Sequence, residues 1–193
     1  MQQLICDLER IVSQPVNERD RVLRVADRLQ EFVASEPVLD PRFTARGRNT
    51  YARHLVHRDA QDRFTLVVLV WEPGQGTSIH DHGTWGMIGA LNNKIASWVY
   101  ERRDDGVREG TAELEEIRFA KAEAGSLLPL VLPPDDEIHR IKNDSDGVTI
   151  SIHVYGKDIL RCRRYDINDN HWEWYNLSYT TVQNERDAHR LSR

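Results

Sequence analysis

Residues 73–82, with the sequence PGQGTSIHDH, are the most informative part of this chain for its fold and its metal site. A glycine-broken turn leads into His80 and His82, which a single residue separates. In an extended strand, alternate side chains share one face about 6–7 Å apart, so both imidazoles can reach one metal ion while Asp81 points away. His139, in the distant sequence EIHR, can complete the set. The spacing therefore predicts a metal site of three imidazoles.

Short apolar segments separated by turn-rich sequence surround this stretch. The expected strands are 51–56, 64–71, 87–91, 95–101, 113–119, 127–132 and 148–155. Clusters of glycine, proline, asparagine and aspartate at 73–76, 104–106, 133–136 and 143–147 mark the turns. The sequence between the strands lacks the helical pattern that a parallel sheet would require. Residues 46–180 are therefore expected to form a sandwich or small barrel.

The first 45 residues have a different pattern. Apolar residues repeat at helical spacing over 4–12 and again over 22–33, and Asn17 with Asp20 three places on resembles a capping box. Two helices are therefore expected to pack on the barrel. The highly polar residues 181–193 are expected to form a solvated tail. The prediction is one mainly β domain over residues 1–193, with N-terminal helices.

Composition narrows the classes of function. With 31 acidic and 26 basic residues the net charge is −5, which gives no overall attraction to nucleic acid or anionic lipid. No apolar run approaches the eighteen or so residues that span a bilayer, and the N-terminus lacks the pattern of a secretory signal. Cys6 and Cys162 are too few for a disulfide framework or a thiolate-rich metal site. A cytoplasmic protein with reduced thiols is expected.

The strand over 148–155 has one apolar and one polar face. Ser151, His153 and Tyr155 alternate on the polar face. That face can point to water, as in an ordinary amphipathic strand. If apolar elements cover the outside of the barrel, it can instead point inward and form a hydrogen-bonded row that polarises the Tyr155 hydroxyl.

Four motifs in order resemble the thiol dioxygenases of the cupin superfamily, which include cysteine dioxygenase and the bacterial 3-mercaptopropionate dioxygenases. They are PGxGxSIHDH over 73–82, WGxIG over 85–89, IHRxxN over 138–143 and SIHVYG over 151–156. The resemblance implies a cupin β-barrel, or jelly roll, and one non-haem iron(II) per chain, with O2 as co-substrate. It implies His80, His82 and His139 as the iron ligands and Ser151, His153 and Tyr155 as an outer-sphere catalytic triad.

Gly86 sets this chain apart within the resemblance. Most cupins have a glutamate ligand at this place, so three neutral imidazoles would leave the full charge on the metal and favour a thiolate. In the animal enzymes a cysteine there is crosslinked to the triad tyrosine, which Gly86 rules out here. Trp85, beside it, is a candidate to line the substrate pocket.

The substrate of such an enzyme would be a small thiol that carries a carboxylate. Arg53 stands where the family has a carboxylate-binding arginine or a glutamine, and Arg163 and Arg164 resemble the arginine used by the mercaptopropionate enzymes. Guanidinium binds carboxylate in a bidentate manner, so cysteine, 3-mercaptopropionate and a dicarboxylic thiol such as mercaptosuccinate are all candidates for oxidation to the sulfinate. The chain is expected to be a monomer or a small homo-oligomer.

Two other interpretations of the three histidines stay open. The first is a zinc lyase or hydrolase in which the metal activates water, although Ser151, His153 and Tyr155 then have no task. The second is a non-enzymatic, metal-binding cupin that senses a small ligand.

Overall fold

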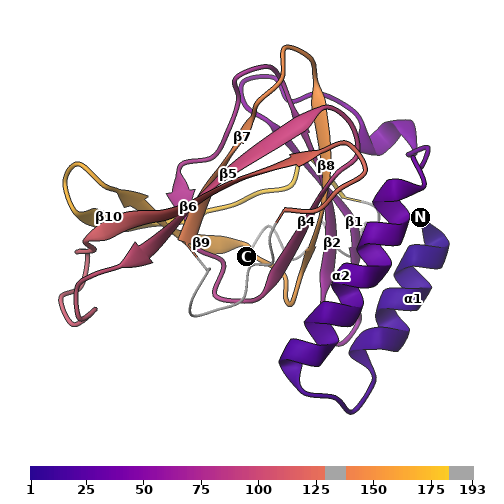
Figure 1. Cartoon of the computed structure of the whole chain (residues 1–193), viewed down its shortest axis with the longest axis horizontal. Helices are drawn as coiled ribbons and strands as arrows, with labels where there is room; N and C mark the ends of the chain where they lie inside the picture. The colour runs from indigo at the N-terminus through magenta and orange to yellow at the C-terminus, as the bar shows by residue number, and fades with distance from the viewer. Residues whose placement is uncertain (129–137, 183–193) are drawn as a thin grey trace.

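The computed structural model describes residues 1–128 and 138–182 (Figure 1). Helices α1 (Gln2–Val12) and α2 (Glu18–Ala34) come first, followed by the short 3-10 helix η1 (Pro41–Phe43). The strands are β1 (Ala52–Arg58), β2 (Thr65–Trp71), β3 (Ile79–His80), β4 (Gly86–Ala90), β5 (Lys94–Arg102), β6 (Leu114–Glu123), β7 (Ile138–Asn143), β8 (Thr149–Tyr155), β9 (Arg161–Asp166), β10 (His171–Asn176) and β11 (Thr181–Val182). The expected mainly β fold with N-terminal helices is confirmed.

Both helices form for the reasons that the sequence suggested. The Asn17 side chain accepts a hydrogen bond from the Asp20 backbone N–H and so caps α2. Each helix buries one apolar stripe, and the two stripes meet the outer face of a sheet. In Figure 1 the helices cover the sheet that contains β1, β2 and β4.

The strands form two sheets that pack face to face. Their orders are β11-β1-β2-β8-β4 and β10-β9-β3-β7-β5-β6. Among the described strands, β11 and β1 pair in parallel and every other pair is antiparallel. The two-residue β3 lies between β9 and β7, which places the His80–His82 stretch at the centre of the second sheet.

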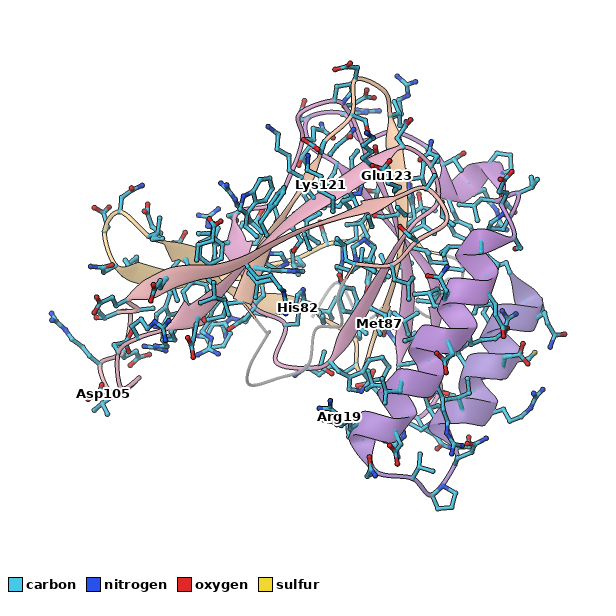
Figure 2. All side chains as sticks on the ribbon, viewed as in Figure 1. Arg19, His82, Met87, Asp105, Lys121 and Glu123 are labelled. Atoms are coloured by element: carbon cyan, nitrogen blue, oxygen red, sulfur yellow. The ribbon has the colours of Figure 1, made fainter. Side chains whose placement is uncertain are left out.

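Strand β2 separates two layers of the core. Its residues Leu66, Val68 and Val70 face the helices, whereas Val67 and Leu69 face the space between the sheets. This double burial explains the continuous apolar run of β2. Figure 2 shows Met87 beside α2 and His82 inside the barrel.

Strand β8 turns its polar face inward. Ile152 and Val154 pack in the layer beneath the helices, while Ser151 and His153 are fully buried on the opposite face. The alternative in which this polar face points to water is therefore wrong. The physical reason is that α1 and α2 cover the outer face, so the apolar side chains find their partners there.

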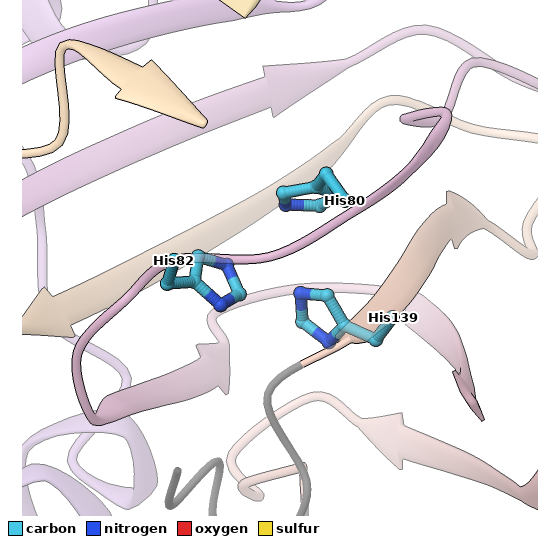
Figure 3. A group of neighbouring side chains, drawn as sticks. All are labelled: His80, His82 and His139. Atoms are coloured by element: carbon cyan, nitrogen blue, oxygen red, sulfur yellow. The ribbon is translucent and has the colours of Figure 1, made fainter. Parts of the chain in front are cut away.

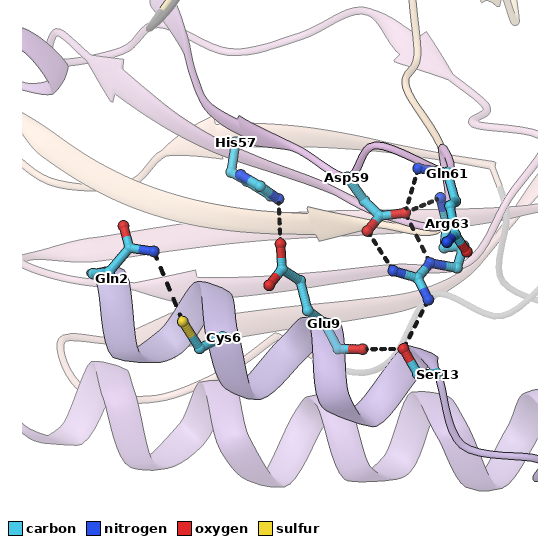
Figure 4. Close-up of polar contacts among 8 residues, drawn as sticks. All are labelled: Gln2, Cys6, Glu9, Ser13, His57, Asp59, Gln61 and Arg63. Carbon is cyan, nitrogen blue, oxygen red and sulfur yellow. Dashed lines mark hydrogen bonds and ion pairs between the residues drawn. The ribbon is translucent and has the colours of Figure 1, made fainter.

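Polar contacts fasten α1 to the barrel (Figure 4). Glu9 lies 3.4 Å from His57 Nε2, and Arg63 donates to the Ser13 hydroxyl at 2.7 Å. Arg63 is itself held by the nearly buried Asp59, whose carboxylate also accepts from backbone N–H groups of its own turn. The helix is thus attached to the sheet by side chains at several points, in addition to its apolar stripe.

Five strands escaped the sequence prediction: β3, β7, β9, β10 and β11. The solvated tail expected from residue 181 is wrong for Thr181 and Val182, because they form β11 and pair with β1. The expected strand 127–132 lies mostly outside the described residues, and Leu127 makes only an isolated bridge with Gly89. The polar residues 183–193 of the expected tail lie outside them as well. In the part of the chain that is described, no helix has both the length and the apolar surface that a bilayer crossing requires.

Candidate metal centre and substrate cavity

Three histidines from two strands converge inside the barrel. His80 ends β3, His82 follows in the connection to β4, and His139 lies on β7. His80 and His139 are direct partners in the β3/β7 ladder, which explains how residues 59 positions apart in the sequence meet. Their rings point toward one another (Figure 3), with centroids 4.7–4.9 Å apart.

The donor atoms fit a metal ion. One nitrogen from each ring can be chosen so that all three lie within 4.8 Å of one another. A histidine nitrogen binds a metal such as zinc at about 2.1 Å, so nitrogens that share an ion lie roughly 3–4 Å apart. The three nitrogens therefore lie close to the separation that one shared ion requires.

Neighbouring oxygens select the nitrogen that each ring presents. His80 Nδ1 hydrogen-bonds to the Ser78 carbonyl at 3.0 Å, which leaves Nε2 for a ligand. His139 Nδ1 contacts the Ser97 hydroxyl at 3.3 Å, and His139 Nε2 is buried without a hydrogen-bond partner. An orphaned buried nitrogen is costly unless something binds it. Burial also lowers the pKa of both imidazoles, most strongly that of His139, so they stay neutral and able to coordinate a metal.

Asp81 points away from the metal site, as expected, and anchors the loop that carries two of the ligands. Its carboxylate is 3% exposed and accepts hydrogen bonds from the Arg163 backbone N–H and the Tyr165 hydroxyl, both at 2.9 Å. It also forms an ion pair with the Arg163 side chain. The segment between His80 and His82 is therefore tied to β9.

A hydrogen-bonded row runs along the inner face of β8. Ser151 Oγ lies 2.7 Å from His153 Nε2, and His153 Nδ1 lies 2.8 Å from the Tyr155 hydroxyl. Tyr155 stacks on His82 with 5.2 Å between ring centroids, so the row ends beside the metal site. Directly opposite Tyr155 in the β4/β8 ladder is Gly86, which has no side chain to crosslink.

Trp71 orients this row. Its indole N–H, which can only donate, gives a hydrogen bond to Ser151 Oγ at 2.9 Å. If Ser151 then donates to His153 Nε2, the ring hydrogen lies on Nδ1 and is donated to the Tyr155 oxygen. In this tautomer the Tyr155 hydroxyl hydrogen is not used within the row and can be donated into the cavity.

Burial keeps the row neutral. It lowers the pKa of His153 to about 3, and the positive charge of Arg53 acts in the same direction. Burial also raises the pKa of Tyr155 above its usual value. At neutral pH Tyr155 is therefore a phenol that donates, not a phenolate.

A cavity of about 190 Å³ opens beside His80, His82 and Tyr155. This is smaller than the roughly 300–1,000 Å³ of pockets for drug-sized ligands, so it suits a molecule of a few heavy atoms. Arg53 and Arg164 line it, and none of its described lining residues is acidic. The cavity therefore favours an anion.

The buried Arg53 is well placed to bind that anion. It is 7% exposed, and its Nη2 donates to the Ile159 carbonyl at 2.9 Å. Its Nη1 is buried without a hydrogen-bond partner. A buried guanidinium with an unused donor and no carboxylate at hydrogen-bond distance among the described residues is a site for an anionic ligand.

The other residues proposed for substrate binding make different contacts from Arg53. Arg164 reaches the cavity but forms an ion pair with Glu173 on the neighbouring strand β10. Arg163 does not line the cavity, because its side chain pairs with Asp81. Trp85 does not line it either and is buried in the apolar layer beneath the helices. Substrate contacts by Arg163 and Trp85 are thus not supported, since both side chains have structural partners.

Sequence reasoning missed two residues at this site. Trp71 was not singled out, because its bond to Ser151 depends on the register of β2 against β8. Cys162 is buried and lines the cavity, and burial raises the pKa of its thiol to about 11. The thiol stays protonated at neutral pH, which makes it a poor nucleophile, and no local pattern signals its position.

Comparisons with known proteins found relatives over most of the chain. The family described as cysteine dioxygenase type I matches residues 1–168. The chain is 25% identical over 171 residues to cysteine dioxygenase type 1 of Danio rerio, covering 85% of this chain and 80% of that protein. It is 23% identical over 173 residues to cysteine dioxygenase type 1 of Homo sapiens, covering 86% and 81%.

A solved structure of a cupin superfamily protein from Desulfitobacterium hafniense is also similar. It matches with a TM-score of 0.42 and 12% sequence identity, over 59% of this chain and 84% of that one. With the family match and the two-sheet architecture, the expected cupin fold is confirmed.

Proposed function

Because the chain belongs to the cysteine dioxygenase type I family, we propose that it is an iron(II) enzyme that oxidises a carboxylate-bearing thiol. The reaction joins both atoms of O2 to the substrate sulfur, so that R–SH and O2 give the sulfinic acid R–SO2H. The observation that carries the proposal is that three different groups meet at one cavity: a cluster of three imidazoles, a tyrosine hydroxyl and a buried guanidinium with an unused hydrogen-bond donor.

His80, His82 and His139 would hold the iron, and no carboxylate joins them within the described residues. When bound there, iron(II) would keep its full dipositive charge, select the thiolate form of the substrate and activate dioxygen. The chain's contribution is to keep the His80 and His139 rings neutral by burial and, through Ser78 and Ser97, to orient them.

Arg53 would fix the carboxylate end of the thiol. Its Nη1 has no partner, and the cavity that Arg53 lines has no acidic residue among its described lining, so the carboxylate would meet an uncompensated positive charge. The sulfur would then lie toward the histidines, with a short carbon chain between. Holding both ends of a small substrate in this way converts binding energy into orientation.

Tyr155 would act as a hydrogen-bond donor in the cavity. With the ring hydrogen on Nδ1, His153 would donate to the phenol oxygen and direct the hydroxyl into the cavity, while Ser151 and Trp71 hold the imidazole. A preorganised donor stabilises negative charge that develops on an oxygen or sulfur of the reacting molecules. The neighbouring Gly86 leaves this phenol unmodified.

The charges around the cavity favour thiols without an ammonium group. No described lining residue would pair with the ammonium of cysteine, whereas Arg164 at the edge of the cavity is a second cation. We therefore place 3-mercaptopropionate and mercaptosuccinate ahead of cysteine as substrates. A second carboxylate would have to compete with Glu173 for Arg164, and this exposed ion pair is worth only about 0–1 kcal/mol.

Oxygen uptake by the iron-loaded protein tests the proposal. The substrates are mercaptosuccinate, 3-mercaptopropionate and cysteine, with ethanethiol as the control that lacks a carboxylate. We expect uptake of one O2 per thiol, a sulfinate product by mass spectrometry and the lowest kcat/KM for ethanethiol. Absence of thiol-dependent uptake would refute the proposal, and a requirement for zinc instead of iron would favour the lyase or hydrolase interpretation.

A further inference from the structure

The segment after β10 passes close to Arg53 and is attached to the rest of the protein at four places. The Leu177 backbone N–H donates to the Leu160 carbonyl at 2.8 Å, and the Thr180 N–H donates to the Arg53 carbonyl at 2.7 Å. The Arg53 N–H donates back to the Thr180 hydroxyl at 3.0 Å. The next two residues form β11, which pairs with β1, and the Tyr179 hydroxyl provides the fourth attachment.

Tyr179 is the residue of this segment that meets the Arg53 side chain. Its ring lies under the guanidinium, with Arg53 Cζ 4.2 Å from the ring centroid. Its hydroxyl donates to Asp158 at 2.5 Å, and Asp158 forms a buried ion pair with Arg58. The ring is therefore held at both ends, by the segment's backbone and by a charged pair of the barrel.

Contacts at one nitrogen and on one face hold the guanidinium. Nη2 is committed to the Ile159 carbonyl, the flat face is covered by Tyr179, and Nη1 remains without a partner. An aromatic face stabilises a desolvated cation without neutralising it, whereas a carboxylate partner would compete with the substrate. The arrangement keeps Arg53 buried, charged and available.

We propose that Tyr179 is a positioning residue that holds the Arg53 guanidinium for the substrate carboxylate, so that the segment from Leu177 to Thr180 sets the enzyme's selectivity for carboxylated thiols. This inference rests on the proposed function of Arg53. The segment lies beyond residues 1–168, the part of the chain that the family match covers.

The surface of the same molecule offers a matched control. Arg161 lies over the exposed Trp174 ring at 4.3 Å, which is the same type of contact at nearly the same distance. Neither residue lines the cavity. Trp174→Leu therefore removes an arginine–aromatic pair without touching Arg53.

The experiment compares Tyr179→Leu, Tyr179→Phe and Trp174→Leu with the wild-type iron-loaded protein. We expect Tyr179→Leu to raise KM for 3-mercaptopropionate about tenfold with kcat within about twofold, because it weakens uniform binding of the carboxylate. Its kcat/KM for ethanethiol should not change. Tyr179→Phe, which keeps the ring, should stay within about threefold of the wild-type KM, and Trp174→Leu should match the wild type throughout.

Three results would overturn the inference: an unchanged KM in Tyr179→Leu, an equal loss for ethanethiol, or an equal effect of Tyr179→Phe. A binding measurement separates this failure from failure of the proposed function. Titration of the metal-free proteins with propionate, followed by NMR, should show about tenfold weaker binding to Tyr179→Leu than to the wild type. That result would support the role of Tyr179 even if no thiol were oxidised, and equal binding to both proteins would refute it.

Discussion

Asp81→Asn should loosen the loop that carries His80 and His82. In the wild type, one carboxylate oxygen accepts from the Arg163 backbone N–H, and the other accepts from the Tyr165 hydroxyl and the Arg163 side chain. An amide has one oxygen and one NH2 group, so in either orientation it presents hydrogens to a group that donates. At least one of these bonds is lost, together with the negative charge.

The magnitude follows from the burial of Asp81. Hydrogen bonds to a charged group contribute about 1.5–3 kcal/mol each, so losing one and weakening the others should cost about 2–4 kcal/mol of unfolding free energy. That is a large fraction of the 5–15 kcal/mol typical of a domain. Because the loop orients two ligands, metal affinity should also fall, by about 10–100-fold as for other groups that support metal ligands.

Two measurements check this prediction: urea unfolding of the metal-free protein, and iron(II) titration in competition with a chelator. Asp144→Asn is the control, since Asp144 is a half-exposed carboxylate that pairs with Lys121 at 2.6 Å. It should cost no more than about 1 kcal/mol and leave metal affinity unchanged. If Asp81→Asn binds iron(II) as tightly as the wild type, the loop anchor does not orient the ligands and the reasoning fails.

The remaining predictions concern the row on β8 and the buried arginine. Tyr155→Phe should lower kcat about 100-fold or more without changing iron affinity, because the hydroxyl donates in the cavity and is not a ligand; oxygen uptake and metal titration check this. Arg53→Gln should raise KM for 3-mercaptopropionate about 100-fold and leave ethanethiol turnover nearly unchanged, and an equal loss on both thiols would contradict the carboxylate role. The pKa of His153 is near 6.5 in the unfolded state and about 3 in the folded state. Between these values the unfolded state binds more protons, so stability falls as the pH falls. Between pH 6 and 4, the unfolding free energy of the wild type should drop more steeply than that of His153→Asn, by up to about 1.4 kcal/mol per pH unit.

The strands that the sequence did not predict are those whose buried positions are polar or whose apolar residues are few. In β7 the buried residues include His139 and Asn143, so apolar alternation is absent. Strands β9 and β10 carry arginines that stack on aromatic rings, such as Arg161 over Trp174. Pairing with a neighbouring strand stabilises these segments. The apolar pattern of a segment does not show which strand it will pair with.

The two helices, the strand-rich remainder and the candidate ligands could be predicted from the sequence alone, because periodicity and His-x-His spacing are properties of neighbouring residues. Only the tertiary structure decided that the polar face of β8 turns inward, since this depends on the helices covering the other face. It also decided which arginine stays unpaired: Arg163 and Arg164 meet carboxylates across β9, whereas Arg53 meets a carbonyl and the ring of Tyr179. The physical reason is that burial and ion pairing are set by strand register between segments far apart in the chain, and one residue's slip would exchange the two faces.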